Sequence, residues 1–346
     1  MLNELVLLLA KVLIIMLIPL GVLPLIIHVE RRGAAFIQKR TGPNRVGPFG
    51  LLQPLADVVK FMFKEEVVPS HVKPFFYQLA PIFAVMVALM PLASIPLCGP
   101  FDFNGATIFP ESFRSSMGIF FVFAAASLGS YAILIAGWSS NNKFSMLGAI
   151  RASAQMVSYE LSMSITLVAM FFLYSTNDMH QMVAYQNETI LGFLPRWGFF
   201  YQPVAALIFL VGIFAESNRL PFDLAEGESE LVAGYHVEYS SMKFALFFMA
   251  EYIHMIVLSA VFIILFFGGY NLLPGMSLLT NFIPVPILQV GSLIFKVGFM
   301  IWLFVWVRWS IPRLRYDQLM NLGWKGLLPL GVLNLIVTVA VIYFNK

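Results

Sequence analysis

The sequence predicts an all-α polytopic membrane protein that forms one transmembrane domain over residues 1–346. Hydrophobic residues make up 60% of the chain and charged residues only 11%, whereas soluble globular chains are about 45–50% apolar and about 25% charged. The mean hydropathy is +0.84. Apolar runs of ~20 residues, the length of a helix that crosses a bilayer, recur along the whole chain.

About eight transmembrane helices are expected from these runs. They cover about 5–29, 75–98, 115–138, 156–175, 202–217, 243–267, 286–310 and 327–344. The first run is too long for the apolar core of a signal peptide and leads into HVERRG, so we interpret it as a helix that stays in the membrane. The fifth helix is short and starts at a proline. No internal repeat is evident, which argues against a transporter built from inverted repeats.

Between the first two helices, residues 51–66 have the pattern of an amphipathic helix. Apolar residues at 51, 52, 55, 58, 59 and 62 form one helical stripe, which predicts a helix lying along the membrane interface. The segment before it, ERRGAAFIQKRTGPNRVGPFG, is too rich in Gly and Pro to form one helix. A simple role as a membrane anchor would account for the apolar stripe. The polar face leaves a second interpretation open, in which Asp57 and Lys60 face a cavity.

The basic residues predict how the chain is oriented. Sixteen of the 21 Lys and Arg residues fall in or beside the loops after helices 1, 3, 5 and 7. The opposite loops contain only Arg114 and Arg196. Because cytoplasmic loops are enriched in Lys and Arg, the basic face is expected to be cytoplasmic, and both termini lie on the other side.

The start of the fourth helix carries polar residues in an otherwise apolar segment. Arg151, Gln155 and Tyr159 share a helical face because they are four residues apart. Glu160 follows at or just inside the membrane. It is either a functional carboxylate or one half of a fixed structural pair with Arg151.

An acidic stretch from Phe214 to Glu251 is the most unusual feature of the chain. Seven of the 18 carboxylates fall within it, most of them in an acidic loop expected over residues 217–242. Crowded carboxylates at a membrane are costly and titrate together, so they indicate a site that binds and releases protons. An exposed acidic loop is the ordinary alternative, although Leu224 and Leu231 give this segment an apolar side. Glu251 lies ~12 Å into its helix, counted from Lys243 at 1.5 Å per residue.

Within the acidic stretch, the spacing suggests how the charges pair. Glu226 and Glu230 are four residues apart and share a face if the segment is helical. Arg219 is expected to neutralise a neighbour, either Glu216 or Asp223.

Two further groups of charged residues lie near the C-terminus. Lys296 is ten residues into its helix, near mid-membrane, where it needs a carboxylate partner or a polar ligand in a cavity. Arg308, Arg313 and Arg315 follow, and their ordinary interpretation is as anchors on the basic face.

The sequence contains no motif for a resident cofactor. It has neither a GxGxxG nor a GxxxxGK[ST] run, and its five histidines are scattered. The single cysteine, Cys98, cannot form an internal disulfide, a zinc site or an iron–sulfur site. We therefore expect no metal, no covalently bound cofactor and no catalytic residue acting in this chain alone.

Four long runs resemble one family. ERRGAAFIQKRTGPNRVGPFGLLQPLADVVKF, QMVSYE, AESNRLPFDLAEGESELVAGYHVEYSSMKFALFFMAEY and IPRLRYDQLMNLGWK are similar, in order, to the membrane subunit of respiratory complex I known as NADH dehydrogenase subunit 1, the H subunit in bacteria. The resemblance implies a subunit of a proton-translocating NADH:quinone oxidoreductase that forms the quinone-binding chamber and an acidic channel to the proton-pumping subunits. Related hydrogenase membrane subunits share the acidic stretch.

The resemblance also implies roles for particular residues. The residues implied to line or guard the quinone path are Arg31, Gln38, Arg40, Asp57, Phe248, Lys296, Arg308 and Arg313. Those implied to form the proton channel are Glu160, Glu216, Asp223, Glu226, Glu228, Glu230, Glu238 and Glu251. Quinone is the implied substrate, while NADH, FMN and iron–sulfur clusters bind partner subunits.

The implied partners are the peripheral-arm subunits at the quinone site, the adjacent small membrane subunits and lipid, with no nucleic acid. The implied location is an energy-coupling membrane, with the bacterial inner membrane favoured over the mitochondrial one. Two other classes fit the acidic stretch: a secondary transporter that works as a single chain, and a membrane anchor for a hydrogenase-like complex. Co-purification with many partners would distinguish them.

Overall fold

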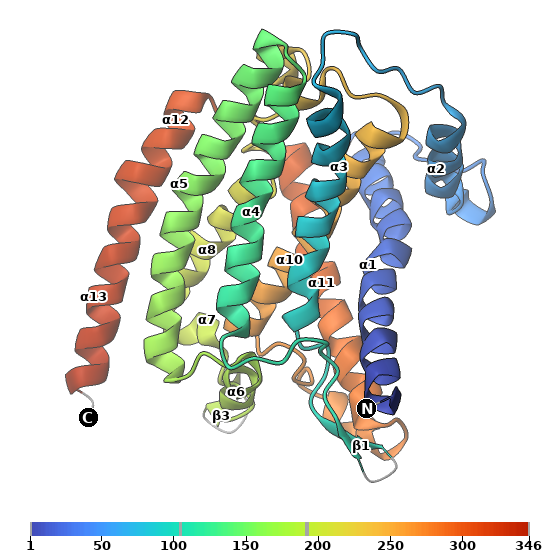
Figure 1. The fold of residues 1–346 in the computed structure, drawn as a ribbon. Helices are drawn as coiled ribbons and strands as arrows, with labels where there is room; N and C mark the ends of the chain where they lie inside the picture. The colour runs from blue at the N-terminus through green and yellow to red at the C-terminus, as the bar shows by residue number, and fades with distance from the viewer. Residues whose placement is uncertain (1, 104–105, 191–193, 345–346) are drawn as a thin grey trace.

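The computed structural model describes residues 2–103, 106–190 and 194–344, which form one bundle of long helices (Figure 1). Seven described helices are long and apolar enough to cross a membrane, and an eighth apolar helix is shorter, which confirms the predicted fold class. The long helices are α1 (Leu2–Ile37), α3 (Pro74–Leu89), α4 (Gly118–Ser139), α5 (Lys143–Tyr174), α10 (Ser241–Phe266), α11 (Val285–Ser310) and α13 (Leu328–Phe344).

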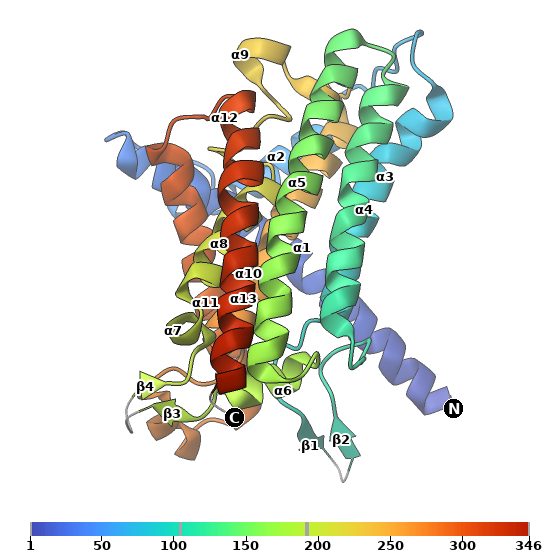
Figure 2. The ribbon, with the colours of Figure 1, turned by 90° about the vertical axis from the view of Figure 1, so that its left-hand side faces the viewer.

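Shorter elements connect and extend the long helices. They are α2 (Gln53–Phe63), α6 (Met179–Tyr185), α7 (Gly198–Tyr201), α8 (Pro203–Glu216), α9 (Glu228–Leu231) and α12 (Tyr316–Asn321). A π-helical segment, Leu322–Leu327, joins α12 to α13, and 3-10 turns lie at Pro48–Gly50, Met90–Ser94, Gly234–His236 and Met276–Asn281. Two antiparallel hairpins, β1 (Phe101–Phe103) with β2 (Ala106–Ile108) and β3 (Thr189–Ile190) with β4 (Leu194–Pro195), lie at the lower end in Figure 2.

Three helices extend further than the apolar runs indicate. The first continues past the expected end at 29 to Ile37, and the fourth begins at Lys143 instead of 156. The last is continuous with α12 and the π-helical segment, so the helical span begins at Tyr316 instead of 327. An apolar run reports only the part of a helix that lies in hydrocarbon, and a helix can continue beyond it. At the start of α5 the Asn142 side chain accepts a hydrogen bond from the Phe144 backbone N–H at 3.0 Å, so this end is capped.

The short helix α8 creates space inside the bundle. Its 14 residues span about 21 Å, less than the ~30 Å of bilayer hydrocarbon. In Figure 1 its upper end lies below the upper ends of α4 and α5. The non-helical backbone after Glu216 therefore descends between the other helices, and Ser217, Asn218 and Arg219 are all buried. Irregular backbone at this depth is stable only where protein surrounds it.

The central element of the bundle is α10. In the most apolar stretch of α10, 78% of the residues are buried within the chain. The corresponding share is 17% for the helical span that ends in α13. The packing partners of α10 include α3, α11, α8 and α1. A polar residue on α10 thus faces other helices of this chain, whereas the outer face of α13 is open to lipid or to other proteins.

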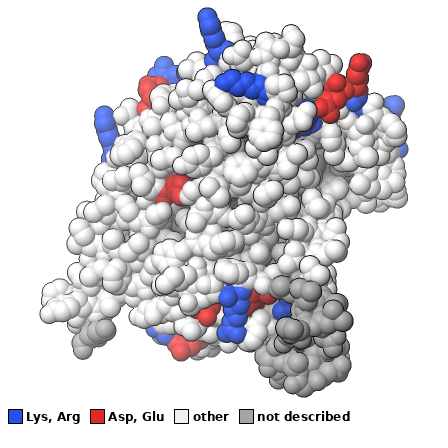
Figure 3. Space-filling model, viewed as in Figure 1, with Lys and Arg blue, Asp and Glu red and all other residues white. Residues whose placement is uncertain are grey.

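The charged residues mark the two ends of the bundle. In Figure 3 the Lys, Arg, Asp and Glu side chains of one face gather near the top and the bottom, with a band almost free of charge between them. The two segments with most basic residues, around α2 and around α12, share the upper end in Figures 1 and 2. The apolar side chains of α2, including Leu55, Val59 and Met62, are exposed, as expected for a helix that rests on the interface.

Candidate functional site

A cavity of about 500 Å³, the entry cavity, lies between α1, α2, α10 and α11. Its walls are mainly apolar side chains, and its charged residues lie on α1, α2, α11 and the segment after α1. The apolar residues include Leu23, Ile27, Phe61, Phe244, Phe248 and Met249, and the charged residues are Glu30, Arg31, Arg40, Asp57 and Arg308. A cavity with apolar walls and a few convergent charges suits a ligand with a polar head and a long apolar tail.

Glu30 is the centre of the charged groups in the entry cavity. Its side chain is only 8% exposed, and one carboxylate oxygen forms ion pairs with Arg308 and, at 3.5 Å, with Arg219. The other oxygen accepts a hydrogen bond of 2.5 Å from the Tyr252 hydroxyl. A buried carboxylate needs this density of partners, because each unpaired charge in a low-dielectric interior costs several kcal/mol.

Arg219 connects Glu30 to a second acidic group. Its guanidinium lies 3.5 Å from Glu30 and 4.0 Å from Glu251, and it stacks on the Tyr252 ring, 4.1 Å from the ring centroid. Glu251 also accepts a hydrogen bond from the Tyr235 hydroxyl at 3.1 Å. The sequence-based expectation that Arg219 neutralises Glu216 or Asp223 is met only for Asp223, where the Arg219 charge opposes the rise in pKa without forming an ion pair. The ion pairs of Arg219 are with Glu30 and Glu251. The backbone turns at Ser217 and Asn218, so the Arg219 side chain points toward α1 and α10.

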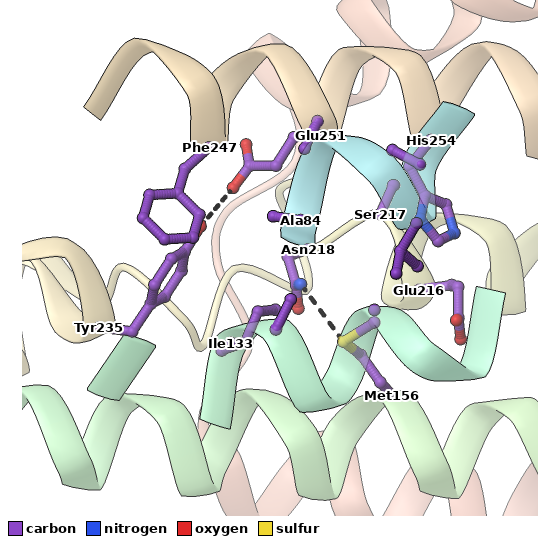
Figure 4. A pocket seen from close by; sticks show the side chains of 15 residues that line it. Ala84, Ile133, Met156, Glu216, Ser217, Asn218, Tyr235, Phe247, Glu251 and His254 are labelled. Carbon is purple, nitrogen blue, oxygen red and sulfur yellow. Dashed lines mark hydrogen bonds between the residues drawn. The ribbon is translucent and has the colours of Figure 1, made fainter. Parts of the chain in front are cut away.

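Beyond Glu251 lies a smaller space, the inner cavity, of about 50 Å³ (Figure 4). It is enclosed by α3, α4, α5, α8 and α10 and by the loop after α8. Its polar lining residues are Glu216, Ser217, Asn218, Tyr235, Glu251 and His254. Both carboxylate oxygens of Glu216 are buried and have no hydrogen-bond partner among the described residues. Glu160, on α5, is close enough for its charge to act on Glu216, and it accepts a hydrogen bond from Ser127 on α4.

Gln155 holds the loop between the two cavities in place. It is fully buried, and its side-chain amide donates to the carbonyl oxygens of Ala215 and Phe222, each at 2.7 Å, and to Asn218 at 3.3 Å. One side chain of α5 thus fastens both the end of α8 and the returning loop. The loop is therefore part of the packed interior, which argues against the alternative of an exposed acidic loop for this part of the stretch.

The next part of the loop contacts α5 through two glycines. A Cβ atom on Gly148 would lie 2.8 Å from the Cα atom of Gly234, so only glycine allows this approach. Gly234 also has a φ of +59°, which side-chain-bearing residues rarely adopt. Ser145, one turn earlier on α5, donates to the Tyr235 carbonyl oxygen at 2.9 Å. These contacts place the Tyr235 ring against Glu251.

Asp223 and Glu226 are half-buried in this loop, beside Arg219, Arg308 and Glu251. Burial raises the pKa of Asp223, although the charges of Arg313, Arg308 and Arg219 oppose the shift. Burial, together with the charges of Glu251 and Asp223, raises the pKa of Glu226 to about 8. Glu226 is therefore a group that exchanges protons near neutral pH.

Another acidic residue of the stretch lies at the surface of the loop. Glu230 is exposed, and it pairs with Arg151 at 2.6 Å and with Arg313 at 3.9 Å. The hydrogen bond from Arg151 holds the pKa of Glu230 below its usual value. Glu226 and Glu230 do not share a helical face, because α9 begins only at Glu228. The side chain of Glu228 lies outside the described part of the structure.

Glu238 and Arg151 have partners that the sequence did not indicate. Glu238 accepts a hydrogen bond from Asn142 at 2.7 Å, and His71 lies 3.6 Å from the same oxygen, so Glu238 fastens the loop to the α4–α5 turn. The alternative of a fixed pair between Arg151 and Glu160 is wrong, because Arg151 pairs with Glu230 and Glu160 with Ser127.

Of the eight residues expected along the quinone path, five line the entry cavity: Arg31, Arg40, Asp57, Phe248 and Arg308. Arg31 pairs with Asp57, which ties the end of α1 to α2. Gln38 accepts a hydrogen bond from Arg40 at 2.6 Å. Arg313 lies with the acidic loop, 3.9 Å from Glu230.

Lys296 lies apart from the entry cavity. It is twelve residues, or about 18 Å of helix, before Arg308. Its ammonium donates to the carbonyl oxygens of Gly269 and Asn271, each at 2.8 Å, and its side chain borders a separate apolar cavity of about 520 Å³. Two backbone carbonyls thus take the place of the expected carboxylate partner, and the third N–H of the ammonium remains for a ligand in the cavity.

Sequence reasoning missed several buried polar residues. The predicted first helix ends at residue 29 and leaves Glu30 outside it, but α1 continues for two more turns and carries Glu30 inside. Its position before two arginines was the only signal. Tyr252 and His254 follow Glu251 in the sequence, and no motif assigns them a role. At the lower end, buried Glu111 lies 3.0 Å from His180, and no pattern in the sequence joins them. Among the described residues, no cluster of three or more His, Cys, Asp or Glu side chains could hold a metal ion.

Comparisons with known proteins agree on one family. The sequence model described as NADH dehydrogenase matches residues 9–339. The H subunit of the NADH-quinone oxidoreductase of Bdellovibrio bacteriovorus is 44% identical over 366 residues, covering 96% of this chain and 95% of the relative. The same subunit of Flavobacterium psychrophilum is 47% identical over 312 residues, 89% of each chain. NADH-quinone oxidoreductase subunit 8 of Rhodothermus marinus is 45% identical over 321 residues, 90% of each chain.

Proposed function

This chain belongs to the NADH dehydrogenase family and is a membrane subunit of an NADH-quinone oxidoreductase, and from that premise we propose that its entry cavity receives the quinone and that its interior carboxylates couple quinone reduction to proton translocation. Electrons for the reaction come from cofactors in partner subunits. This chain contributes the binding surface and the groups that exchange protons.

The shape and polarity of the entry cavity support the first half of the proposal. A quinone has a polar head and an isoprenoid tail. Phe244, Phe248 and Leu23 offer apolar surface for the tail, and the charged side chains of Arg31, Asp57 and Arg308 offer hydrogen bonds for the head as it moves inward. The neighbouring α2 exposes its apolar stripe, so this side of the cavity is close to lipid, from which a quinone must enter.

The observation that carries the second half is the position of Arg219. Its guanidinium contacts Glu30, a wall residue of the entry cavity, and lies 4.0 Å from Glu251, a wall residue of the inner cavity. Two acids, Glu30 and Glu251, share one cation across the boundary between the cavities. A change of charge on one side must alter how strongly Arg219 holds the other.

The coupling follows from this shared cation. Reduction of a quinone to a quinol takes up two electrons and two protons, so charge and protonation change in the entry cavity on each turnover. When Glu30 holds Arg219 less tightly, the guanidinium moves toward Glu251 and favours its ionised form. Glu251 then releases a proton into the inner cavity, toward Glu216 and Glu160. Glu226, whose pKa is about 8, exchanges protons with the loop side of the same cluster.

The same family membership supports a proposal for the surroundings of the chain. We place the basic upper end in the cytoplasm by the positive-inside rule, in a bacterial inner membrane. Peripheral-arm subunits would bind over the loops at that end. Small membrane subunits would cover outer faces such as α13, which is only 17% buried within this chain.

The experiment replaces Glu216 and Glu226 by Gln, one at a time, in the assembled complex. Both changes keep the side-chain volume and remove the exchangeable proton. We expect NADH-dependent quinone reduction and proton translocation to fall at least tenfold, since a lost acid–base group typically costs about 100-fold or more in rate. Glu188→Gln, an exposed acid paired with Arg196 at the opposite end, is the control and should behave as the wild type. Unchanged reduction and translocation in both channel variants would refute the coupling role.

A further inference from the structure

We propose that His254 is a proton-relay residue, which carries protons between Glu251 and Glu216 through water held in the inner cavity. The inference rests on the proposed function, because it adds a step to the path from the entry cavity to Glu216. Neither the acidic motif nor the spacing of the carboxylates assigns this histidine a role.

His254 lines the same cavity as the two acids that the path must connect. His254 follows Glu251 by three residues on α10, so both side chains project from the same face of the helix. Figure 4 shows Glu251 and Tyr235 toward one end of the inner cavity, and His254 and Glu216 toward the other. Within the described residues, no hydrogen bond joins Glu251 directly to Glu216, so a proton needs an intermediate carrier.

Several polar atoms face the inner cavity without a partner. The Nε2 atom of His254 and both carboxylate oxygens of Glu216 are buried, and none has a hydrogen-bond partner among the described residues. Leaving such atoms dry costs a few kcal/mol each, so a cavity bounded by them holds water. A volume of about 50 Å³ has room for roughly three or four waters at 10–15 Å³ each.

The surrounding helices leave space for the imidazole ring. Gly129 of α4 lies opposite it: a Cβ atom there would be 3.9 Å from the Cε1 atom of His254 and 3.4 Å from the methyl group of Met156. The charged or titratable groups that face the cavity are Glu251 on the same helix, Glu216 on α8 and Tyr235 on the loop. Glu160 of α5 and Arg219 of the loop act on it from just behind these residues.

An imidazole is suited to this step because it accepts a proton on one ring nitrogen and releases one from the other. A proton leaves the Glu251 carboxyl through water and binds one nitrogen of His254. The proton on the other nitrogen then passes to the Glu216 carboxylate. Tautomer exchange returns the ring to its starting form, so one proton moves from Glu251 to Glu216 and no group is consumed. From Glu216 the path continues to Glu160 and Ser127.

The test compares variants of His254 in the complete complex. His254→Asn and His254→Gln keep a polar side chain that cannot titrate, whereas His254→Glu restores a proton carrier. We expect the first two to lose at least tenfold in quinone reduction and in proton translocation, and the Glu variant to recover part of both with a shifted pH profile. His28→Asn is the matched control, since His28 is also a buried membrane histidine and lines neither cavity.

Parallel measurements separate the relay from the coupling role. If Glu251→Gln and Glu216→Gln lose activity while His254→Asn keeps the rate and pH profile of the wild type, water alone carries the proton and the relay is refuted. If both Glu variants keep wild-type activity, the proposed coupling role itself is refuted, and the relay that rests on it is refuted as well. Should His254→Asn not assemble, Ala84→Val decides: it fills the cavity with apolar volume and alters no titratable group, and intact proton translocation in that variant would contradict the relay.

Discussion

Replacing Glu30 by Gln tests the shared cation most directly. The change keeps the shape of the side chain and an oxygen that accepts hydrogen bonds, but it removes the negative charge between Arg219 and Arg308. Arg219 then has one acidic ion-pair partner left among the described residues, Glu251, 4.0 Å away. We expect Glu251 to be held as a permanent ion pair and to stop exchanging protons with the inner cavity.

The magnitude follows from the geometry. Two unit charges separated by the 3.5 Å between Arg219 and Glu30 interact by about 4–5 kcal/mol at an effective dielectric constant of about 20. The amide oxygen of Gln retains part of this as a hydrogen bond, which leaves a loss of roughly 2–3 kcal/mol. At about 1.4 kcal/mol per tenfold change in rate, quinone turnover should fall roughly 30- to 150-fold.

The assay is NADH-dependent quinone reduction by membranes that contain the assembled complex. Oxidation of NADH by an artificial acceptor that takes electrons ahead of the quinone measures assembly in the same sample. Glu30→Asp keeps the charge and should retain more activity than Glu30→Gln. Glu66→Gln is the matched control, because it removes an acid from an ion pair with Lys243 whose carboxylate is 45% exposed, and such pairs contribute about 0–1 kcal/mol.

The reasoning about Arg219 would be refuted by a Glu30→Gln variant that assembles normally and turns over quinone within about threefold of the wild-type rate. That result would mean that the charge on Glu30 does not influence the protonation of Glu251. Loss of activity in the Asp variant to the same extent as in the Gln variant would point to packing in the entry cavity instead of charge.

Two further predictions concern pH and Lys296. The pKa of Glu226 rises from an ordinary value of 4.5 to about 8 on folding. Between these two pH values the folded state keeps a proton that the unfolded state has lost. The contribution of Glu226 to the free energy of unfolding is therefore full below pH 4.5 and declines as the pH rises toward 8. Glu226→Gln should remove this decline: between pH 5 and 8.5 the Tm of the complex should fall less in the variant, and equal falls would contradict the assignment. Lys296→Met leaves two buried carbonyl oxygens without their donor, which costs about 1–3 kcal/mol each. The Tm should therefore drop while the KM for quinone stays within about twofold; a large rise in KM would return Lys296 to the quinone path.

Single residues show where a sequence pattern is sufficient and where it is not. Glu251 could be recognised as a candidate functional residue, because an ionisable group more than two turns inside an apolar helix is costly and seldom has a purely structural role. Its partner could not, because Arg219 and Glu30 are 189 residues apart and meet only when α8 stops short and α1 runs on past its apolar run. Gln155 likewise looked like one member of a helical face, and its three hydrogen bonds depend on the path of a distant loop.

By itself the sequence determined the membrane class, the number of long helices, the basic end and the acidic stretch, because each of these is a local property of composition or spacing. Only the tertiary structure decided which acids are interior and which are at the surface: Glu216 and Glu251 face the inner cavity, while Glu230 and Glu238 fasten the loop to its surroundings. It also decided that Lys296 is bound by backbone carbonyls far from Arg308. The physical reason is that the ionisation and pairing of a charged side chain depend on the groups that surround it in space. Helices that extend beyond the hydrocarbon bring together groups that no local sequence pattern connects.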